Sequence, residues 1–246
     1  MKSIIAFDLD GTLAESKQPI DEEMAGLFNG LLALVTVVVM SGGDWPQFKR
    51  QLLPRLADGA ALDRLIIMPT SGTKMYRYTS KWQSVYAELF SEEERRRVLS
   101  AMTEAAAAIS NSTDPSWGDR IEDRGSQITF SGLGQAAPLD AKLAWDPDRG
   151  KRRRLKAVLD RSLAGFSVNI GGSTSVDVTR EGVDKGYGIG RLIKATRSDA
   201  SAILFVGDAL YPGGNDESVK RTGVTTIAVR DIEETKRVIE AITACV

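Results

Sequence analysis

Short apolar runs that each end in a turn occur near both ends of the chain. They are residues 3–9, 34–40, 65–72, 202–209 and 225–231. Continuous apolar strands of this kind are typical of a parallel sheet that is covered on both faces. Residues 21–34 begin with acidic side chains and repeat apolar ones at helical spacing, which predicts a helix between the first two strands. The pattern therefore predicts a β-α-β opening in an α/β core.

The middle of the chain has a different pattern. Residues 91–110 begin with the capping pair Ser91 and Glu94 and predict a helix. Residues 166–180 include alternating apolar and polar side chains, which predicts a half-buried antiparallel sheet. An α+β insert within the α/β core explains this change of pattern. We expect the first part of the core at 1–80, the insert at 81–183 and the second part of the core at 184–246.

Composition narrows the possible chemistry and partners. The formal net charge of -1 gives no long-range field that would attract nucleic acid or an anionic membrane. A single cysteine, Cys245, fits a reducing compartment, and the short apolar start of the chain reads as neither a signal peptide nor a membrane span. We therefore expect a cytoplasmic location, with no nucleic-acid or membrane partner. Because the chain has no histidine, proton transfer must fall to Asp, Glu, Lys or Tyr.

A basic run at 148–163 could suggest nucleic-acid binding. Its apolar residues, however, fit one face of a helix; they are Leu155, Val158, Leu159 and Leu163. We interpret the cations as the solvated side of an amphipathic helix.

Two carboxylates one residue apart, Asp8 and Asp10, follow the first predicted strand and precede Gly11. In open α/β sheets, ligands bind outside the carboxyl ends of the strands. Carboxylates this close repel each other unless a cation or a shared proton compensates, and Mg²⁺ prefers oxygen ligands. The motif alone leaves two interpretations open, a magnesium site and a solvated turn.

Three further segments place polar residues after a strand or at the start of a helix. Ser41 follows the second strand, where a hydroxyl and backbone amides can hold phosphate oxygens. Lys185 begins a helix, where its ammonium can neutralise a phosphoryl group. The segment FVGDALYPGGND adds further metal ligands at Asp208, Asn215 and Asp216. Taken alone, Ser41 could be a helix cap, Lys185 a surface lysine and the last segment a polar loop.

Together and in this order, the four segments resemble the haloacid dehalogenase (HAD) superfamily of phosphotransferases. The signature of that superfamily is DxDGT, then Ser or Thr, then Lys, then GD followed by ND, and both core segments carry it. The resemblance implies a Rossmann-like HAD core with a parallel sheet. It also implies that Asp8 is a nucleophile that forms an aspartyl phosphate, and that Asp10 is the general acid and base.

The same resemblance implies a metal site and a phosphate site. Mg²⁺ would be held by the side chains of Asp8 and Asp208 and by the main-chain oxygen of Asp10, with Asn215 and Asp216 nearby. The transferring phosphoryl group would be bound by Ser41 and Gly42 of one segment and by Lys185 of another.

The position of the insert is similar to that of the type IIB caps of this superfamily, which include sugar-phosphate phosphatases and eukaryotic-type phosphomannomutases. The stretch GGSTSVDVTREGVDKGYGI is similar to the mutase pattern GGxxSxDVxxxGxDKxY, and GDALYPGGNDESV is similar to GDxxxPGGND. By this resemblance Ser175 and Asp177 would hydrogen-bond the hydroxyls of a sugar. The alternative is that both residues belong to the polar face of a cap strand.

One departure from the mutase pattern bears on the reaction. Residues 121–135 align with IExRNGxxNxSPxGR, so Arg124 matches an arginine, whereas Gln135 replaces the arginine that binds the distal phosphate of the substrate. Loss of a bidentate cationic clamp weakens the grip on a bisphosphate that a mutase needs. Arg120 and Arg124 are candidates to compensate, or else surface residues.

We therefore expect a Mg²⁺-dependent HAD phosphohydrolase that acts on a small phosphorylated sugar or related metabolite. The alternative is a phosphomannomutase, in which a sugar hydroxyl accepts the phosphoryl group. A third interpretation, a silent binding protein with the same fold, conflicts with the intact motif residues. The mutase resemblance also suggests a homodimer.

Overall fold

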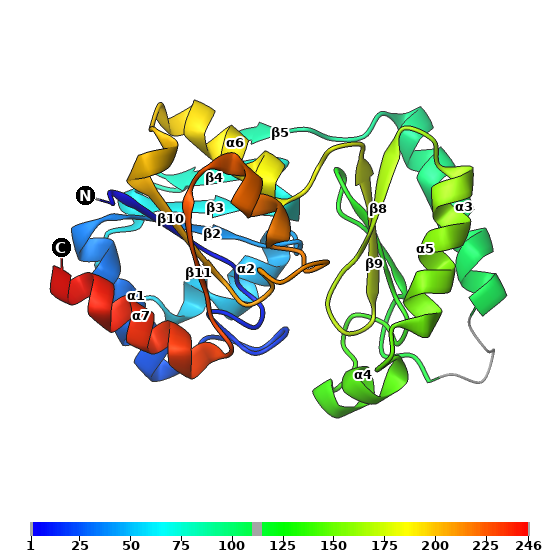
Figure 1. Cartoon of the computed structure of the whole chain (residues 1–246), viewed down its shortest axis with the longest axis horizontal. Helices are drawn as coiled ribbons and strands as arrows, with labels where there is room; N and C mark the ends of the chain where they lie inside the picture. The colour runs from blue at the N-terminus through cyan, green and yellow to red at the C-terminus, as the bar shows by residue number, and fades with distance from the viewer. Residues whose placement is uncertain (1, 110–114, 246) are drawn as a thin grey trace. The chain divides into compact units, whose positions relative to one another are not determined.

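The computed structural model describes residues 2–109 and 115–245 of the chain (Figure 1). The chain divides into two compact units. The core unit comprises Met1–Ala87 and Asp184–Val246, and the insert unit comprises Glu88–Val183.

The described part of the core unit contains a seven-stranded sheet. In sheet order the strands are β11 (Thr225–Ala228), β10 (Ile203–Gly207), β1 (Ile4–Phe7), β2 (Thr36–Met40), β3 (Leu65–Met68), β4 (Lys74–Tyr78) and β5 (Trp82–Ala87). Neighbours from β11 to β3 are parallel, and β4 and β5 are added in antiparallel orientation. The parallel register aligns Phe7 with Val206 on one side and with Val39 on the other. The residues that follow β1, β2 and β10 therefore lie along one edge of the sheet.

Helices cover both faces of this sheet, as its continuous apolar strands require. The helices are α1 (Glu22–Leu34), α2 (Trp45–Gln51), α6 (Lys185–Thr196) and α7 (Ile232–Cys245), and the short 3₁₀ segments are η1 (Leu53–Arg55), η2 (Leu62–Arg64), η3 (Thr70–Gly72), η4 (Ala200–Ala202) and η5 (Glu217–Thr222). Phe28 of α1, Phe48 of α2 and Ile239 of α7 pack in one hydrophobic cluster. Ile189 of α6 belongs to a second cluster, formed with the opposite side of the strands. In Figure 1, α1 and α7 lie side by side.

The five strands predicted from apolar runs are present, but β4 and β5 were not predicted. Residues 81–87 were expected to belong to the insert, whereas β5 is hydrogen-bonded to β4 in the sheet of the core unit. β5 joins this sheet because a tight turn after β4 places Trp82 opposite Tyr78. Most residues of β5 are exposed, so the hairpin lacks the continuous apolar run that marks the parallel strands.

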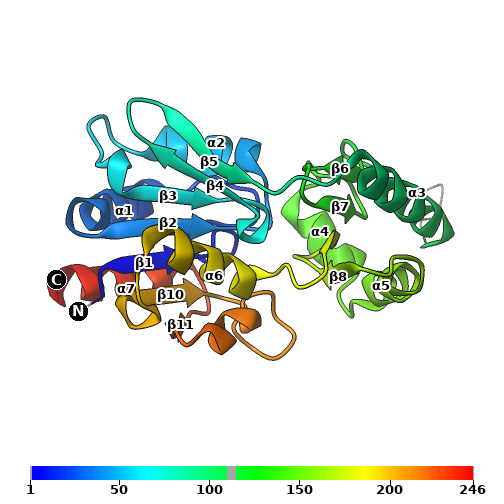
Figure 2. The same ribbon diagram turned by 90° about the horizontal axis from the view of Figure 1, so that it is seen from above.

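The insert unit contains an antiparallel sheet in the order β6-β7-β9-β8. Its elements are α3 (Glu92–Ile109), β6 (Ile121–Asp123), β7 (Ile128–Ser131), α4 (Leu139–Trp145), α5 (Gly150–Ser162), β8 (Phe166–Ile170) and β9 (Ser175–Arg180). Figure 2 shows α3 and α5 on the same side of this sheet. Val98 and Met102 of α3 pack there with Leu155 of α5 and Phe130 of β7. Alternate residues point to the opposite face, which carries Thr129 and Asp177.

Two helix predictions in the insert agree with the structure. Ser91 and Glu94 form the expected reciprocal cap, because the Ser91 amide donates to Glu94 at 2.6 Å and the Glu94 amide donates to the Ser91 hydroxyl at 3.2 Å. Residue 110, at the end of the predicted helix, lies outside the described residues. In α5, Leu155 and Leu159 are buried while Arg153 and Arg154 are exposed, as expected for an amphipathic helix. Arg152 departs from this prediction, because its guanidinium is buried beside Asp146 at 2.8 Å and is not on the solvated side.

The predicted fold class is confirmed: a Rossmann-like α/β core with a mainly parallel sheet and an inserted α+β region with its own sheet. Among the residues that the structure describes, none of the helices combines the length and the apolar character needed to cross a lipid bilayer.

Candidate active site

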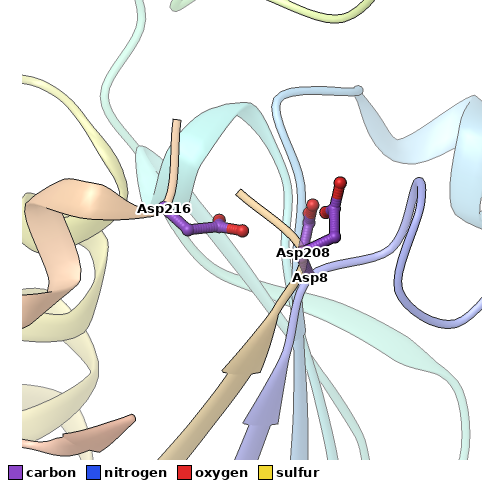
Figure 3. Close-up of side chains that lie close together, drawn as sticks. All are labelled: Asp8, Asp208 and Asp216. Carbon is purple, nitrogen blue, oxygen red and sulfur yellow. The ribbon is translucent and has the colours of Figure 1, made fainter. Parts of the chain in front are cut away.

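Three carboxylates meet at the carboxyl ends of adjacent strands. Asp8 follows β1 and Asp208 follows β10, so the parallel pairing of these strands places the two side chains next to each other (Figure 3). Asp216 comes from the turn before η5 and points toward them. Each residue offers an oxygen, and these oxygens all lie within 4.8 Å of one another.

Lys185 is buried against this cluster. It is the first residue of α6, whose N-cap Asp184 accepts a hydrogen bond from the Tyr187 amide at 2.8 Å. The Lys185 ammonium lies 2.6 Å from a carboxylate oxygen of Asp8 and 2.5 Å from one of Asp216. One cation is therefore shared by two carboxylates.

The charges of the cluster are unbalanced. Burial raises the pKa of Asp8 well above its usual value; Lys185 opposes this shift, and the carboxylates of Asp216 and Asp208 add to it. Burial also raises the pKa of Asp208, with a further contribution from Asp216. Burial lowers the pKa of Lys185, but Asp216 and Asp8 outweigh it, so the pKa lies above its usual value. Three oxygen donors with excess negative charge fit a hard divalent cation.

The turn after β1 is shaped by its contact with Asp208. Gly11 has φ 86°, and a Cβ atom there would lie 2.7 Å from a carboxylate oxygen of Asp208. The hydroxyl of Thr12 donates to that carboxylate at 3.2 Å and accepts from the Asp208 amide at 3.1 Å. Gly11 thus leaves room for Asp208 and Thr12 holds it by hydrogen bonds, and neither role was predicted from the sequence.

The carboxylate of Asp10 has different contacts from that of Asp8. It accepts hydrogen bonds from the Lys17 amide at 2.8 Å, from Gln47 at 2.6 Å and from Gln51 at 3.1 Å. Within the described residues it is not part of the acidic group. The two aspartates of the motif therefore occupy separate environments, and no motif in the sequence pointed to either glutamine.

The predicted phosphate-binding residues lie along the same sheet edge. Ser41 directly follows β2, is buried, and accepts a hydrogen bond from the Gly43 amide at 3.0 Å. Gly42 lies between them in the turn. Asn215 precedes Asp216 and is exposed. The binding roles of these residues stay predictions.

The predicted sugar-binding residues belong to the insert unit. Ser175 and Asp177 lie two residues apart on β9 and so face the same way. The Thr129 hydroxyl donates to Asp177 at 2.7 Å. The buried Arg124 guanidinium donates to the carboxylate of Glu122 at 2.5 and 2.9 Å. Arg124 therefore already has an anionic partner within the unit.

Gln135 lies in the turn between β7 and α4. Its side-chain nitrogen is buried and has no hydrogen-bond partner among the described residues. Its backbone carbonyl accepts from the Lys142 ammonium at 3.4 Å. Arg120 is the other arginine proposed to compensate for Gln135. Its backbone carbonyl accepts a hydrogen bond from the Ser131 amide. The substrate roles of all these residues stay predictions.

Comparisons with known proteins identify the family. The model of the family described as eukaryotic phosphomannomutase matches residues 24–244. A phosphomannomutase from Encephalitozoon cuniculi (strain GB-M1) is 26% identical over 250 residues, which cover 97% of this chain and 93% of that protein. The chain therefore belongs to the eukaryotic phosphomannomutase family, within the HAD superfamily.

Solved structures are similar in fold. An N-terminally truncated IMP-nucleotidase from Plasmodium falciparum matches with a TM-score of 0.72 and 14% identity, over 98% of this chain and 70% of that chain. A haloacid dehalogenase-like hydrolase from Bacteroides thetaiotaomicron matches with a TM-score of 0.64 and 18% identity, over 98% of this chain and all (100%) of that one. At these identities the likeness shows the fold alone.

These findings bear on the predicted function. The resemblance to the HAD superfamily and the prediction of a HAD-type enzyme are confirmed. Of the two reactions that the sequence left open, the family match favours phosphomannomutase, the alternative, over the hydrolase that was preferred.

Proposed function

We propose that the chain is a phosphomannomutase-type phosphotransferase, which moves a phosphoryl group between the 1- and 6-positions of a hexose. The observation that carries this proposal is the family match over residues 24–244. The buried group formed by Asp8, Lys185, Asp208 and Asp216 supports it. Positioning and charge neutralisation are the main requirements of phosphoryl transfer, and these residues can supply both.

In the proposed reaction, a carboxylate oxygen of Asp8 attacks phosphorus and forms an aspartyl phosphate. The bond from phosphorus to the sugar oxygen breaks, and Asp10 donates a proton to that oxygen. Asp10 then takes a proton from the acceptor hydroxyl, whose oxygen attacks phosphorus and releases Asp8. Lys185 stays charged between Asp8 and Asp216 and faces the nucleophile throughout.

A divalent metal ion, Mg²⁺ in this proposal, fits the carboxylates of Asp8, Asp208 and Asp216. When bound, it would supply the positive charge that lowers repulsion between these carboxylates and the phosphoryl group. The main-chain oxygen of Asp10 and the side chain of Asn215 are further candidate ligands. A cytoplasmic location and a homodimer belong to the proposal as expectations of the sequence.

A second candidate, the sugar-phosphate phosphatase, is favoured by one residue. Gln135 carries no charge where the mutase pattern has an arginine, and its side-chain nitrogen lacks a partner among the described residues. A weaker grip on the distal phosphate would let the sugar product leave after its phosphoryl group has passed to Asp8, before its hydroxyl can take that group back. Water would then accept the phosphoryl group from Asp8.

One assay distinguishes the two candidates. The protein is incubated with mannose 1-phosphate, Mg²⁺ and a catalytic amount of hexose 1,6-bisphosphate, and both mannose 6-phosphate and free phosphate are measured. A mutase forms the 6-phosphate, depends on the bisphosphate and releases little phosphate. Phosphate release without isomerisation would support the phosphatase. If neither mannose 6-phosphate nor free phosphate formed, the proposal would be overturned. The variant Gln135→Arg should raise the ratio of isomerised product to free phosphate.

A further inference from the structure

We propose that Gln47 is a positioning residue, which holds the carboxylate of Asp10 where it exchanges protons with the substrate. The proposal rests on the proposed function, because it assigns Asp10 the acid and base role. Asp10 lies in a turn and its side chain is 26% exposed, so the turn alone does not fix its rotamer. Its orientation therefore has to come from the groups that contact it.

Gln47 supplies such a contact with both ends of its amide. The buried side chain projects from α2, and its nitrogen donates to an Asp10 oxygen at 2.6 Å. Its oxygen accepts from the Lys17 ammonium at 2.5 Å. The Lys17 ammonium itself lies 4.0 Å from the same Asp10 oxygen. A flipped amide would point its NH₂ at a cation and its oxygen at an anion, so only one orientation satisfies both neighbours.

The other oxygen of Asp10 is held as well. Gln51, one helical turn after Gln47, donates to it at 3.1 Å and to the Gln18 carbonyl at 2.7 Å. The Gln51 amide oxygen is buried without a partner in the described residues, so the two donated bonds decide its orientation. The Lys17 amide, in a backbone with φ 64°, donates to the same Asp10 oxygen at 2.8 Å. With both oxygens bound, the plane of the Asp10 carboxylate is fixed.

The backbone beside Gln47 leaves room for this arrangement. A Cβ atom at Gly43 would lie 1.9 Å from the Gln47 amide oxygen. The Gly43 amide also donates to the hydroxyl of Ser41, so the turn that precedes α2 connects the two groups. Any side chain at position 43 would push the flexible Gln47 side chain away from Lys17 and Asp10.

The test compares two phosphoryl donors that differ in their need for an acid. Hexose 1,6-bisphosphate releases a sugar hydroxyl, which must be protonated, whereas 2,4-dinitrophenyl phosphate releases a stable phenolate. For Gln47→Leu we expect kcat/KM to fall by about 10- to 100-fold with the bisphosphate and by less than about threefold with the aryl phosphate. The kcat with the aryl phosphate should also fall, because release of Asp8 needs Asp10 as a base. A rapid burst of dinitrophenolate should precede that slow step.

Two further variants make the result specific. Gly43→Ala should reproduce the selective loss of kcat/KM without altering Gln47 itself. Gln83→Leu makes the same change at an exposed site on β5 and should leave kcat/KM unchanged with both donors. If kcat/KM of Gln47→Leu fell equally with both donors, or did not fall with either, the positioning role would be overturned while the proposed function stands. A wild-type protein that uses neither donor would overturn the proposed function, and the positioning role with it.

Discussion

The core unit and the insert unit both bury charged side chains, but they balance the charges differently. At the strand ends of the core unit, three carboxylates lie near the ammonium of Lys185. In the insert unit, the buried guanidinium of Arg152 faces one carboxylate, that of Asp146, at 2.8 Å. The other N–H groups of Arg152 donate to backbone carbonyls of Asp146, Gly171 and Gly172.

This difference separates a balanced ion pair from a cluster with excess negative charge. A buried ion pair whose hydrogen bonds are all made supports the surrounding fold. An excess of one charge stores repulsion, which a ligand of the opposite charge relieves. We therefore expect a divalent cation to stabilise the cluster around Asp8, and we expect the pair of Arg152 and Asp146 to contribute to stability without a ligand.

The largest effect should come from neutralising the cluster at its nucleophile. We expect Asp8→Asn to lower turnover of every phosphoryl donor by about 10⁴-fold or more, because no other group can form the aspartyl phosphate. The thermal midpoint should not fall, since an amide relieves the repulsion from Asp208 and Asp216. Steady-state assays and thermal unfolding measure the two quantities. Turnover within tenfold of wild type would contradict the assigned nucleophile.

The opposite result is expected when the balanced pair is broken. Arg152→Ala should lower the free energy of unfolding by about 3–5 kcal/mol, because it leaves the Asp146 carboxylate buried without its cation. The matched control is Arg153→Ala, at the exposed neighbour, with a change within about 0.5 kcal/mol. Urea unfolding measures both. If the two variants were equally stable, the pair would not be structural.

Metal should stabilise the core cluster and not the insert. We expect saturating Mg²⁺ to raise the free energy of unfolding by about 2.7 kcal/mol at 100 times its dissociation constant. Asp208→Asn should remove most of this gain, whereas Asp140→Asn, an exposed aspartate of the insert unit, should keep it. Thermal unfolding with Mg²⁺ and then with excess EDTA checks the difference. A gain that survives in Asp208→Asn would place the metal elsewhere.

The smallest effect concerns a partly exposed pair of the insert unit. Hydrogen bonds from Arg180 and from the Ser91 amide lower the pKa of Glu94 to about 2. Because this folded pKa lies below the ordinary value of 4.5, the stabilisation is present above about pH 4.5 and is lost as the pH falls toward about 2. The Arg180 side chain is 39% exposed, so solvent screening keeps the effect below about 1 kcal/mol.

The variant Glu94→Gln tests this pH dependence, since glutamine can still cap the helix without a charge. We expect wild type to be more stable than the variant at about pH 7 and equally stable at about pH 1.5, below the folded pKa of Glu94. Chemical unfolding at the two pH values measures the difference. The same difference at both values would mean that the charge of Glu94 contributes nothing.

Much of the fold could be predicted because the relevant signals are local. Apolar runs marked β1, β2, β3 and β10, because parallel strands covered on both faces are almost wholly apolar. The run at β11 was also apolar enough to be recognised, although this strand at the end of the sheet is only partly buried. The β4–β5 hairpin was missed because most of β5 is exposed, and so it lacks such a run. Residues 91–110 showed their cap at Ser91 for the same local reason, whereas α4, only seven residues long, gave too little periodicity to be detected.

The candidate site divides in the same way. The motifs singled out Asp8, Asp208 and Lys185, because residue type and the order of strands along the chain are properties of the sequence. Only the tertiary structure placed the Lys185 ammonium between Asp8 and Asp216, and only it brought Gln47 onto Asp10 from a helix that lies 37 residues further along the chain. Such contacts depend on how separate elements pack, and the spacing of residues along the chain does not determine those distances.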